Sequence, residues 1–377
     1  MRHSRFELGS RAGFSLVLAL LLGACSSTTI HVPAELPPNA EQLKFKQVWS
    51  AQVGEVDFGL EVKVVGQTLA MAGSDGTVAL INARSGQDIW RSTVGAALAA
   101  GVGHDGKLAA VITRDNELVT LEAGREIWRE RLGAQSFTTP LVAGNRIFVL
   151  GADRSVAAFD GQSGRRLWQQ QRPGEALVLR QAGVLLAVGD TLVVGLSGKL
   201  VGLNPLNGSV RWEVPIASPR GTNDVERLVD LVAHASRSGD VVCARAFQAA
   251  VGCVDATQGK LLWSRPANGF VGLQGDDGLV FGVEADSTVL AWQRSSGERA
   301  WSLEQLRYYK LGEPLVTPQY VLVADAKGLL HFLSRTNGAT LARLSTDESP
   351  VVAAPVLVDD TLVVVNRSGA VFGFRPQ

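Results

Sequence analysis

The sequence predicts an all-β fold, an eight-bladed β-propeller with four antiparallel strands in each blade. Three observations carry this prediction: tryptophans recur about every 40 residues, short apolar runs alternate with turn residues, and no segment after residue 44 has a helical period. A fixed period of this length is typical of a radial or stacked repeat. The tryptophans are spaced 41, 38, 40, 44, 51 and 38 residues apart: Trp49, Trp90, Trp128, Trp168, Trp212, Trp263 and Trp301.

Six of these tryptophans close the same short phrase, in which a glycine stands four residues before the ring. Gly86 with Trp90 and Gly164 with Trp168 are examples. An apolar run precedes the turn that holds the glycine, so the phrase indicates two strands joined by a tight hairpin. Glycine suits such a hairpin because it accepts a positive φ without a steric cost. Further apolar runs upstream, such as residues 191–195, complete four short strands per unit.

Counting the units predicts how the ring closes. The third-strand phrase occurs eight times, near residues 75, 115, 153, 197, 248, 286, 326 and 367. Ala342 stands four residues after Gly338 and is read as a degenerate copy that keeps the frame and loses the ring. The last copy ends before its fourth strand, and residues 44–49 supply that strand from the other end of the chain. We therefore expect a propeller over residues 44–377, closed by pairing of the N-terminal strand with the C-terminal blade, with the Trp rings packed between blades.

The N-terminal residues predict export and lipid attachment. A basic stretch containing Arg2 and Arg5 precedes an apolar core over 14–22, which is too short to span a bilayer. The sequence that follows, ending in Cys25, resembles the bacterial lipobox, which implies a lipoprotein signal peptide over 1–24 and a lipid on Cys25. A plain secretory signal with a chance cysteine is the alternative. Residues 25–43 are rich in proline and poor in apolar residues, and we expect a lipidated flexible tether there.

Charge and the remaining cysteines narrow the class of protein further. The chain has 36 basic and 36 acidic residues, which argues against nucleic acid and against attraction of its surface to anionic lipid. Cys243 and Cys253 lie on two predicted strands of one hairpin, centred on Gln248, and would face each other. An exported protein meets an oxidising environment, so a disulfide is expected, with two reduced core thiols as the alternative.

No constellation of residues predicts catalysis, a metal site or a cofactor. The five histidines have no metal-ligand spacing, and neither a nucleophile elbow nor a phosphate-binding loop is present. Aspartates such as Asp75, Asp115, Asp153 and Asp286 occupy turn positions, where they accept local backbone hydrogen bonds. We therefore expect a protein that is not an enzyme.

The Gly-x-x-x-Trp phrase resembles the repeat of quinoprotein dehydrogenases, so an enzyme is the natural rival. That family uses a vicinal cysteine pair and a carboxylate-bound Ca²⁺ beside the quinone. The chain has no Cys-Cys dipeptide and no large insertion that could cover a cofactor. A quinone-dependent enzyme remains an alternative to the expectation of no cofactor.

Candidate binding residues are sought where the repeat is longest. The excess residues fall at 218–232 and 175–181. Loops inserted into a rigid repeat often carry binding, and their mixture of apolar and ionic residues suits a protein partner. The competing interpretation is an ordinary inner strand for Leu177 and Leu179, and solvated turns for Arg180, Arg227 and Asp230.

Taken together, the lipobox, the eight Trp-bearing blades and these two loops resemble the BamB family, the propeller lipoproteins of the outer-membrane β-barrel assembly machinery. The resemblance covers the whole chain. It implies that Leu177-Val-Leu-Arg180 and Arg227-Leu-Val-Asp230 bind the POTRA region of BamA. A second acidic residue common in the family is Val232 here, which puts one charge contact in question.

The resemblance also implies a non-enzymatic scaffold that works with other subunits of the machinery and with unfolded outer-membrane proteins. The expected location is the outer membrane, with the propeller lipid-anchored and facing the periplasm. A periplasmic propeller that binds a small ligand or a glycan in its central channel is the alternative from another class.

Overall fold

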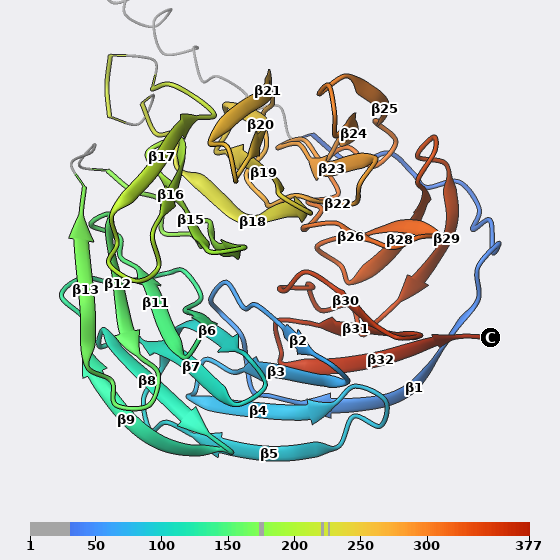
Figure 1. Ribbon diagram of the computed structural model, residues 1–377. Helices are drawn as coiled ribbons and strands as arrows, with labels where there is room; N and C mark the ends of the chain where they lie inside the picture. The colour runs from blue at the N-terminus through green and yellow to red at the C-terminus, as the bar shows by residue number, and fades with distance from the viewer. Residues whose placement is uncertain (1–30, 173–176, 220–221, 225–226) are drawn as a thin grey trace, which may run out of the picture. The chain divides into compact units, whose positions relative to one another are not determined.

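Eight four-stranded antiparallel sheets stand around a central axis and form a β-propeller (Figure 1). The computed structural model describes residues 31–172, 177–219, 222–224 and 227–377. Residues 34–377 form one unit, and everything below concerns that unit. The predicted signal peptide and Cys25 lie outside the described residues, as do parts of the two long loops.

Consecutive strands form the blades, with the innermost strand first. The strands of blades 1 to 4 are β2 (Lys63–Val65), β3 (Thr68–Ala72), β4 (Thr77–Asn82), β5 (Asp88–Thr93), β6 (Leu98–His104), β7 (Leu108–Thr113), β8 (Glu117–Glu122), β9 (Arg125–Arg131), β10 (Leu141–Ala143), β11 (Arg146–Leu150), β12 (Ser155–Asp160), β13 (Arg166–Gln171), β14 (Leu185–Val188), β15 (Thr191–Leu196), β16 (Lys199–Leu203) and β17 (Val210–Pro215).

The remaining blades repeat the same order. The strands of blades 5 to 8 are β18 (Leu231–Ser238), β19 (Val241–Ala246), β20 (Ala250–Asp255), β21 (Lys260–Pro266), β22 (Gln274–Gly275), β23 (Leu279–Val283), β24 (Val289–Gln293), β25 (Arg299–Leu303), β26 (Leu315–Val316), β27 (Tyr320–Ala324), β28 (Leu329–Ser334), β29 (Thr340–Ser345), β30 (Val356–Val358), β31 (Thr361–Val365) and β32 (Ala370–Pro376), with β1 (Phe45–Gln52) as the last strand of blade 8.

The first strand of the chain closes the ring as predicted. β1 pairs with β32 in antiparallel register from Phe45 opposite Pro376 to Gln52 opposite Ala370. The outer strand of blade 8 therefore comes from the N-terminus, while its other three strands come from the C-terminus. Blades 1 and 8 are tied together by main-chain hydrogen bonds, which confirms the closure of the propeller.

The alternation of strand direction gives the ring two faces. The turns between the second and third strands, such as residues 151–154, lie on the same face as the connectors between blades, such as residues 304–314. We call this the connector face. The other hairpin turns of each blade lie on the opposite side, the turn face. The outer strand of every blade runs toward the connector face.

Each recurrent tryptophan packs on the glycine of the next blade. A Cβ on Gly86 would lie 2.5 Å from Cε3 of Trp49, and φ at Gly86 is 70°. The same contact joins Trp301 to Gly338. Trp49 also donates from Nε1 to the carbonyl oxygen of Ala83 at 3.0 Å. The glycine is thus required for its positive φ, as the sequence predicted, and also because the neighbouring indole fills the space of a side chain.

Blade 7 has an alanine at the tryptophan position, and another side chain fills the space beside it. Ala342 is buried opposite Phe332 in the register of β28 and β29. The ring of Phe45 stacks on the ring of Phe332 with centroids 4.7 Å apart. Phe45 stands four residues before Trp49, where the other blades have glycine. A large side chain at the glycine position therefore fills space beside the small side chain at the tryptophan position.

The predicted tether needs a correction over its second part. Residues 34–43 lie along β29, where Gln42 N donates to the Leu341 carbonyl at 2.9 Å. Leu43 packs into the hydrophobic cluster of blades 7 and 8. Composition predicted a tether because this stretch has too few apolar residues to fold alone, but main-chain polar groups also satisfy an open strand edge. The described part of the chain contains no helix that could cross a membrane.

Candidate functional site

The two loops selected from the sequence meet on the connector face. Leu177 to Arg180 lie in the connector from β13 to β14, and Asp230 immediately precedes β18. The backbone N–H of Leu179 donates to Oδ2 of Asp230 at 3.0 Å. The structure therefore brings together two segments 51 residues apart and orders one against the other.

The main chain of Leu177 is held by a hydrogen bond, whereas its side chain is exposed to solvent. Its carbonyl oxygen accepts from Nη2 of Arg154 at 3.2 Å, and Nε of Arg154 donates to Oγ of Ser197 at 2.7 Å. Arg154 is buried, whereas the side chain of Leu177 is 39% exposed. Leu179 is half-buried. An exposed apolar side chain whose main chain is held by hydrogen bonds is suited to a protein partner.

Arg180 lies at the mouth of the central channel. Its guanidinium lies over the ring of Phe137, 5.6 Å from the centroid, and the side chain is exposed. The residue lines a cavity of about 700 Å³ that opens between the inner strands of the blades. A cation–π contact of this kind orients the arginine, and the described residues include no carboxylate that pairs with it.

Arg227 and Val232 differ from the other candidates. The backbone N–H of Arg227 donates to the carbonyl of Asn223 at 3.2 Å, and the side chain is half-buried. Val232, the second residue of β18, is 1% exposed and forms an isolated β-bridge with Gly183 in the connector before β14. A carboxylate at this position would be desolvated, so an apolar residue suits the packing, and the position makes no charged contact at the surface.

Apart from Arg180, the charged groups that line this cavity pair with one another. Asp57 pairs with Arg114 at 2.5 Å, and Lys63 pairs with Glu61 at 3.4 Å. His234 bridges two blades, with Nδ1 2.9 Å from Glu313 and Nε2 3.6 Å from Glu61.

These ion pairs shift the pKa values of His234 and Glu61. The charge of Glu313 raises the pKa of His234 well above its ordinary value against the cost of burial, and Glu61 adds to the effect. Burial alone would raise the pKa of Glu61, but His234 and Lys63 outweigh it and lower that pKa to about 2. Among the described residues that line this cavity, Arg180 is the charged group that no carboxylate faces.

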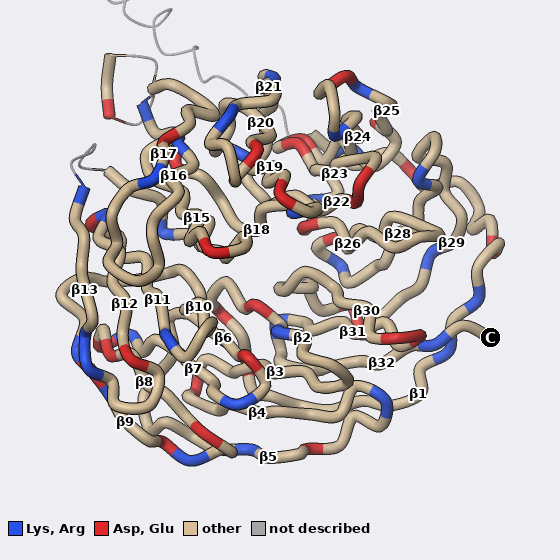
Figure 2. The backbone as a smooth tube through the Cα atoms, viewed as in Figure 1, with Lys and Arg blue, Asp and Glu red and all other residues tan. Residues whose placement is uncertain are grey.

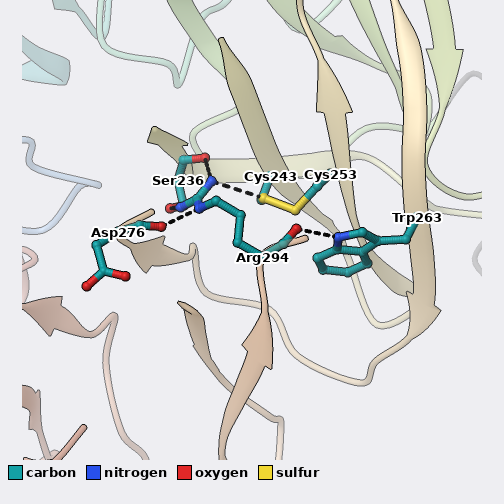
Figure 3. The surroundings of a disulfide bond; sticks show 6 residues. All are labelled: Ser236, Cys243, Cys253, Trp263, Asp276 and Arg294. Atoms are coloured by element: carbon teal, nitrogen blue, oxygen red, sulfur yellow. Dashed lines mark hydrogen bonds between the residues drawn. A yellow bond between two sulfur atoms is a disulfide. The ribbon is translucent and has the colours of Figure 1, made fainter. Parts of the chain in front are cut away.

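The two cysteines selected from the sequence lie in blade 5, next to the loop that ends at Asp230. Cys243 and Cys253 are opposite each other in the register of β19 and β20 and form a disulfide. Figure 3 shows Arg294 directed at this bond, with Nη1 3.2 Å from the Cys243 sulfur. Trp263 donates from Nε1 to the carbonyl of Arg294 at 2.7 Å. The disulfide is buried where blades 5 and 6 meet, and it is a structural feature of the scaffold.

Sequence reasoning missed the residues that support the site. Arg154 occupies a turn position with φ of 63°, where related turns have glycine, as at Gly76. That departure from the repeat was a usable signal. The channel cluster offered none, because Glu61, His234 and Glu313 come from blades 1, 5 and 7. Figure 2 shows basic and acidic segments interspersed around the ring, so no single-sign patch marks either group.

Comparisons with known proteins agree on one family. A family model described as outer membrane protein assembly factor BamB matches residues 74–303. The protein of that name from Burkholderia pseudomallei is 36% identical over 95% of this chain and 96% of its own length. The one from Bordetella pertussis is 33% identical over 100% of this chain and 99% of its own.

Solved structures show the same fold. The crystal structure of BamB from Moraxella catarrhalis superposes with a TM-score of 0.80 at 22% identity, covering 88% of this chain and 100% of that one. A quinohemoprotein alcohol dehydrogenase from Comamonas testosteroni has a TM-score of 0.68 at 16% identity, covering 91% of this chain and 78% of that one. At these identities the likeness concerns the propeller alone.

Proposed function

We propose that this chain, which belongs to the BamB family of outer membrane protein assembly factors, is a non-enzymatic scaffold of the outer-membrane β-barrel assembly machinery. It docks on the POTRA region of BamA through Leu177, Leu179, Arg180, Arg227 and Asp230, alongside the other subunits of the machinery. A lipid on Cys25 anchors it to the outer membrane, with the propeller in the periplasm, where it assists unfolded outer-membrane proteins.

The observation that carries the docking proposal is the pairing of Leu179 with Asp230 beside Arg180. Leu177, which is exposed, and Arg180, which has no ion pair among the described residues, lie on one connector, and Asp230 and Arg154 bind its main chain. Arginine is enriched at the energetically important positions of protein interfaces, and an exposed apolar side chain beside it suits such a contact. Charged groups deeper in the channel are already paired, so a charged small ligand or glycan would have to break those pairs. We therefore do not favour the channel as the primary binding site.

Capture of the purified POTRA region tests this proposal. Arg180→Glu places a negative charge where we expect a complementary carboxylate, and it should reduce capture at least about tenfold, the equivalent of 1.4 kcal/mol. Arg299→Glu on β25 makes the same charge change on an exposed residue of the outer rim and should bind like the parent. Equal capture by both variants would remove the docking surface from the proposal.

A further inference from the structure

Residues 34–43, which we call the strap, imitate an additional strand on blade 7. The side-chain amide of Asn39 makes two hydrogen bonds to the main chain of Arg343 in β29. The N–H of Arg343 donates to Oδ1 of Asn39 at 2.8 Å, and Nδ2 of Asn39 donates to the Arg343 carbonyl at 3.2 Å. These are the groups that a neighbouring strand would satisfy, so the outer edge of β29 is occupied there.

Contacts at both ends fix the direction of the strap. Arg343 Nη1 donates to the Pro37 carbonyl at 2.7 Å, and the Tyr309 hydroxyl donates to the Ala34 carbonyl at 2.5 Å. Leu36 packs beside the cluster that contains Leu311. Because Asn39 faces Arg343 while Gln42 faces Leu341, the strap runs antiparallel to β29. Ala34 therefore lies at the connector face, beside the connector that carries Tyr309.

The strap changes the face from which the preceding chain leaves the propeller. β1 begins at Phe45 on the turn face and runs toward the connector face. Without the strap, the chain from Cys25 to residue 43 would start on the turn face and could extend by at most about 65 Å. With the strap, the nine residues from Cys25 to Ala34 start on the connector face and can extend by at most about 32 Å. Because the six residues of β29 span about 20 Å, the shorter connection brings the connector face closer to the lipid than the turn face.

We propose that the strap turns the connector face of the propeller toward the membrane. The point of exit at blade 7 and the docking surface at blades 3 to 5 then share one face and lie on different sides of the ring (Figure 1). Lipid and partner would hold the ring at two separated points of that face, which restricts its orientation without any membrane insertion. The inference rests on the lipid anchor of the proposed function, and the strap itself does not.

The strap is tested first in solution, on the full chain without its lipid. Hydrogen exchange at the amide of Arg343 should be slow in the parent and about tenfold faster in Asn39→Ala, because one main-chain hydrogen bond is lost. Asn337→Ala is the matched control: Asn337 also uses its side chain to bond main chain, at Ala339 in the same blade, and does not touch the strap. Fast exchange at Arg343 in the parent, or equal exchange in Asn39→Ala, overturns the strap.

The orientation is tested with the lipidated full chain on vesicles of phosphatidylethanolamine and phosphatidylglycerol that contain a nitroxide-labelled lipid. A fluorophore is attached either at Lys310→Cys, on the connector face, or at Gln319→Cys, in a turn-face hairpin of the same blade; both positions are exposed. We expect at least about twofold stronger quenching at 310, and loss of this difference when Asn39→Ala and Tyr309→Phe release the strap.

Two results would overturn the proposal in different ways. Equal quenching at the two positions, or stronger quenching at 319, would contradict the orientation while the anchor of the proposed function stands. Protein that stays in the supernatant would contradict the anchor, and with it the orientation. The exchange measurement in solution separates that second outcome from a missing strap.

Discussion

The carboxylate of Asp230 accepts the backbone N–H of Leu179 at 3.0 Å and so joins the connectors that precede blades 4 and 5. Both connectors carry residues selected from the sequence as candidate contacts with a partner. Asp230 consequently has a positioning role in the free protein: it orders the main chain between exposed Leu177 and Arg180. This role can be separated from a direct charge contact, because asparagine retains an oxygen that accepts the same hydrogen bond.

We expect Asp230→Asn and Asp230→Ala to differ in POTRA binding. If Asp230 acts by positioning, Asp230→Asn should keep most of the affinity, whereas Asp230→Ala should lose at least about tenfold, since a hydrogen bond to a charged group contributes about 1.5–3 kcal/mol. Titration calorimetry with the POTRA region measures both. Equal losses in the two variants would show that the negative charge itself makes the contact.

Substitution of Gly86 tests the packing of each tryptophan on the next blade. Gly86→Ala should lower the free energy of unfolding by more than about 2 kcal/mol, because it adds a left-handed backbone cost to a Cβ 2.5 Å from the indole of Trp49. Gly66→Ala provides the control. Gly66 has φ of 58° but no heavy atom within 4 Å of the added Cβ, so it carries the backbone cost of about 1 kcal/mol alone. Urea denaturation measures the free energy of unfolding of both variants. Equal losses would mean that the indole of Trp49 moves away from the added Cβ without a cost in free energy.

Reduction of the disulfide should destabilise the propeller without altering the fold. With a sequence separation of 10 between Cys243 and Cys253, the chain-entropy contribution is about 3 kcal/mol. The urea midpoint of the parent should fall when a phosphine reductant is added during unfolding, while a Cys243→Ala/Cys253→Ala variant should not respond. A parent midpoint that stays unchanged after both thiols have been alkylated would refute the expected contribution.

The repeat was predictable because blades 1 to 6 use the same local rule. Gly86 and Trp90 lie in one phrase, and the phrase recurs at a fixed period, so one sequence specifies strands, turns and blade number. The Leu179–Asp230 contact was predictable only as two irregular loops, since nothing local indicates that they touch. Glu61, His234 and Glu313 meet from three blades, and the strap uses the side chain of Asn39 in place of a strand. Such contacts depend on how the ring closes and leave no periodic pattern.

The channel cluster predicts how stability changes with pH. The pKa of His234 is raised in the folded state, so its contribution to stability is fully present below its unfolded value of about 6.5 and is lost as the pH rises through the higher folded value. The pKa of Glu61 is lowered to about 2, so its contribution is present above 4.5 and is lost as the pH falls toward 2.

We therefore expect the parent to exceed His234→Gln in urea midpoint by the most between pH 5 and 6.5, near the unfolded pKa values of these groups. The difference should shrink at higher pH. A difference that grows with pH would mean that the imidazole is neutral in the folded channel. Glu313→Gln should lower the pH at which the stabilising contribution of His234 is lost. The reason is that it removes the charge that contributes most to the raised pKa of His234.

A final prediction concerns Phe45 and Ala342, a large side chain at the glycine position of the repeat and a small one at the tryptophan position. Ala342→Trp should lower stability by about 1–3 kcal/mol, because the indole would meet the side chain of Phe45 where other blades have glycine. Phe45→Gly should also lower it, by about 2–3 kcal/mol, through loss of the stack on Phe332. The double variant restores the glycine and tryptophan of the other blades. Its loss in free energy of unfolding should therefore be at least about 1 kcal/mol smaller than the sum of the losses in the two single variants.

The converse exchange at Trp49 and Gly86 provides the control for this cycle. Phe45 begins a strand and has no positive φ, whereas Gly86 has φ of 70°, so Trp49→Ala with Gly86→Phe should show no such recovery. Urea denaturation of the four variants of each pair measures both cycles. Additive losses at Phe45 and Ala342 would mean that the two positions do not share one space. A recovery at Trp49 and Gly86 would mean that size alone, and not backbone conformation, keeps glycine in the repeat.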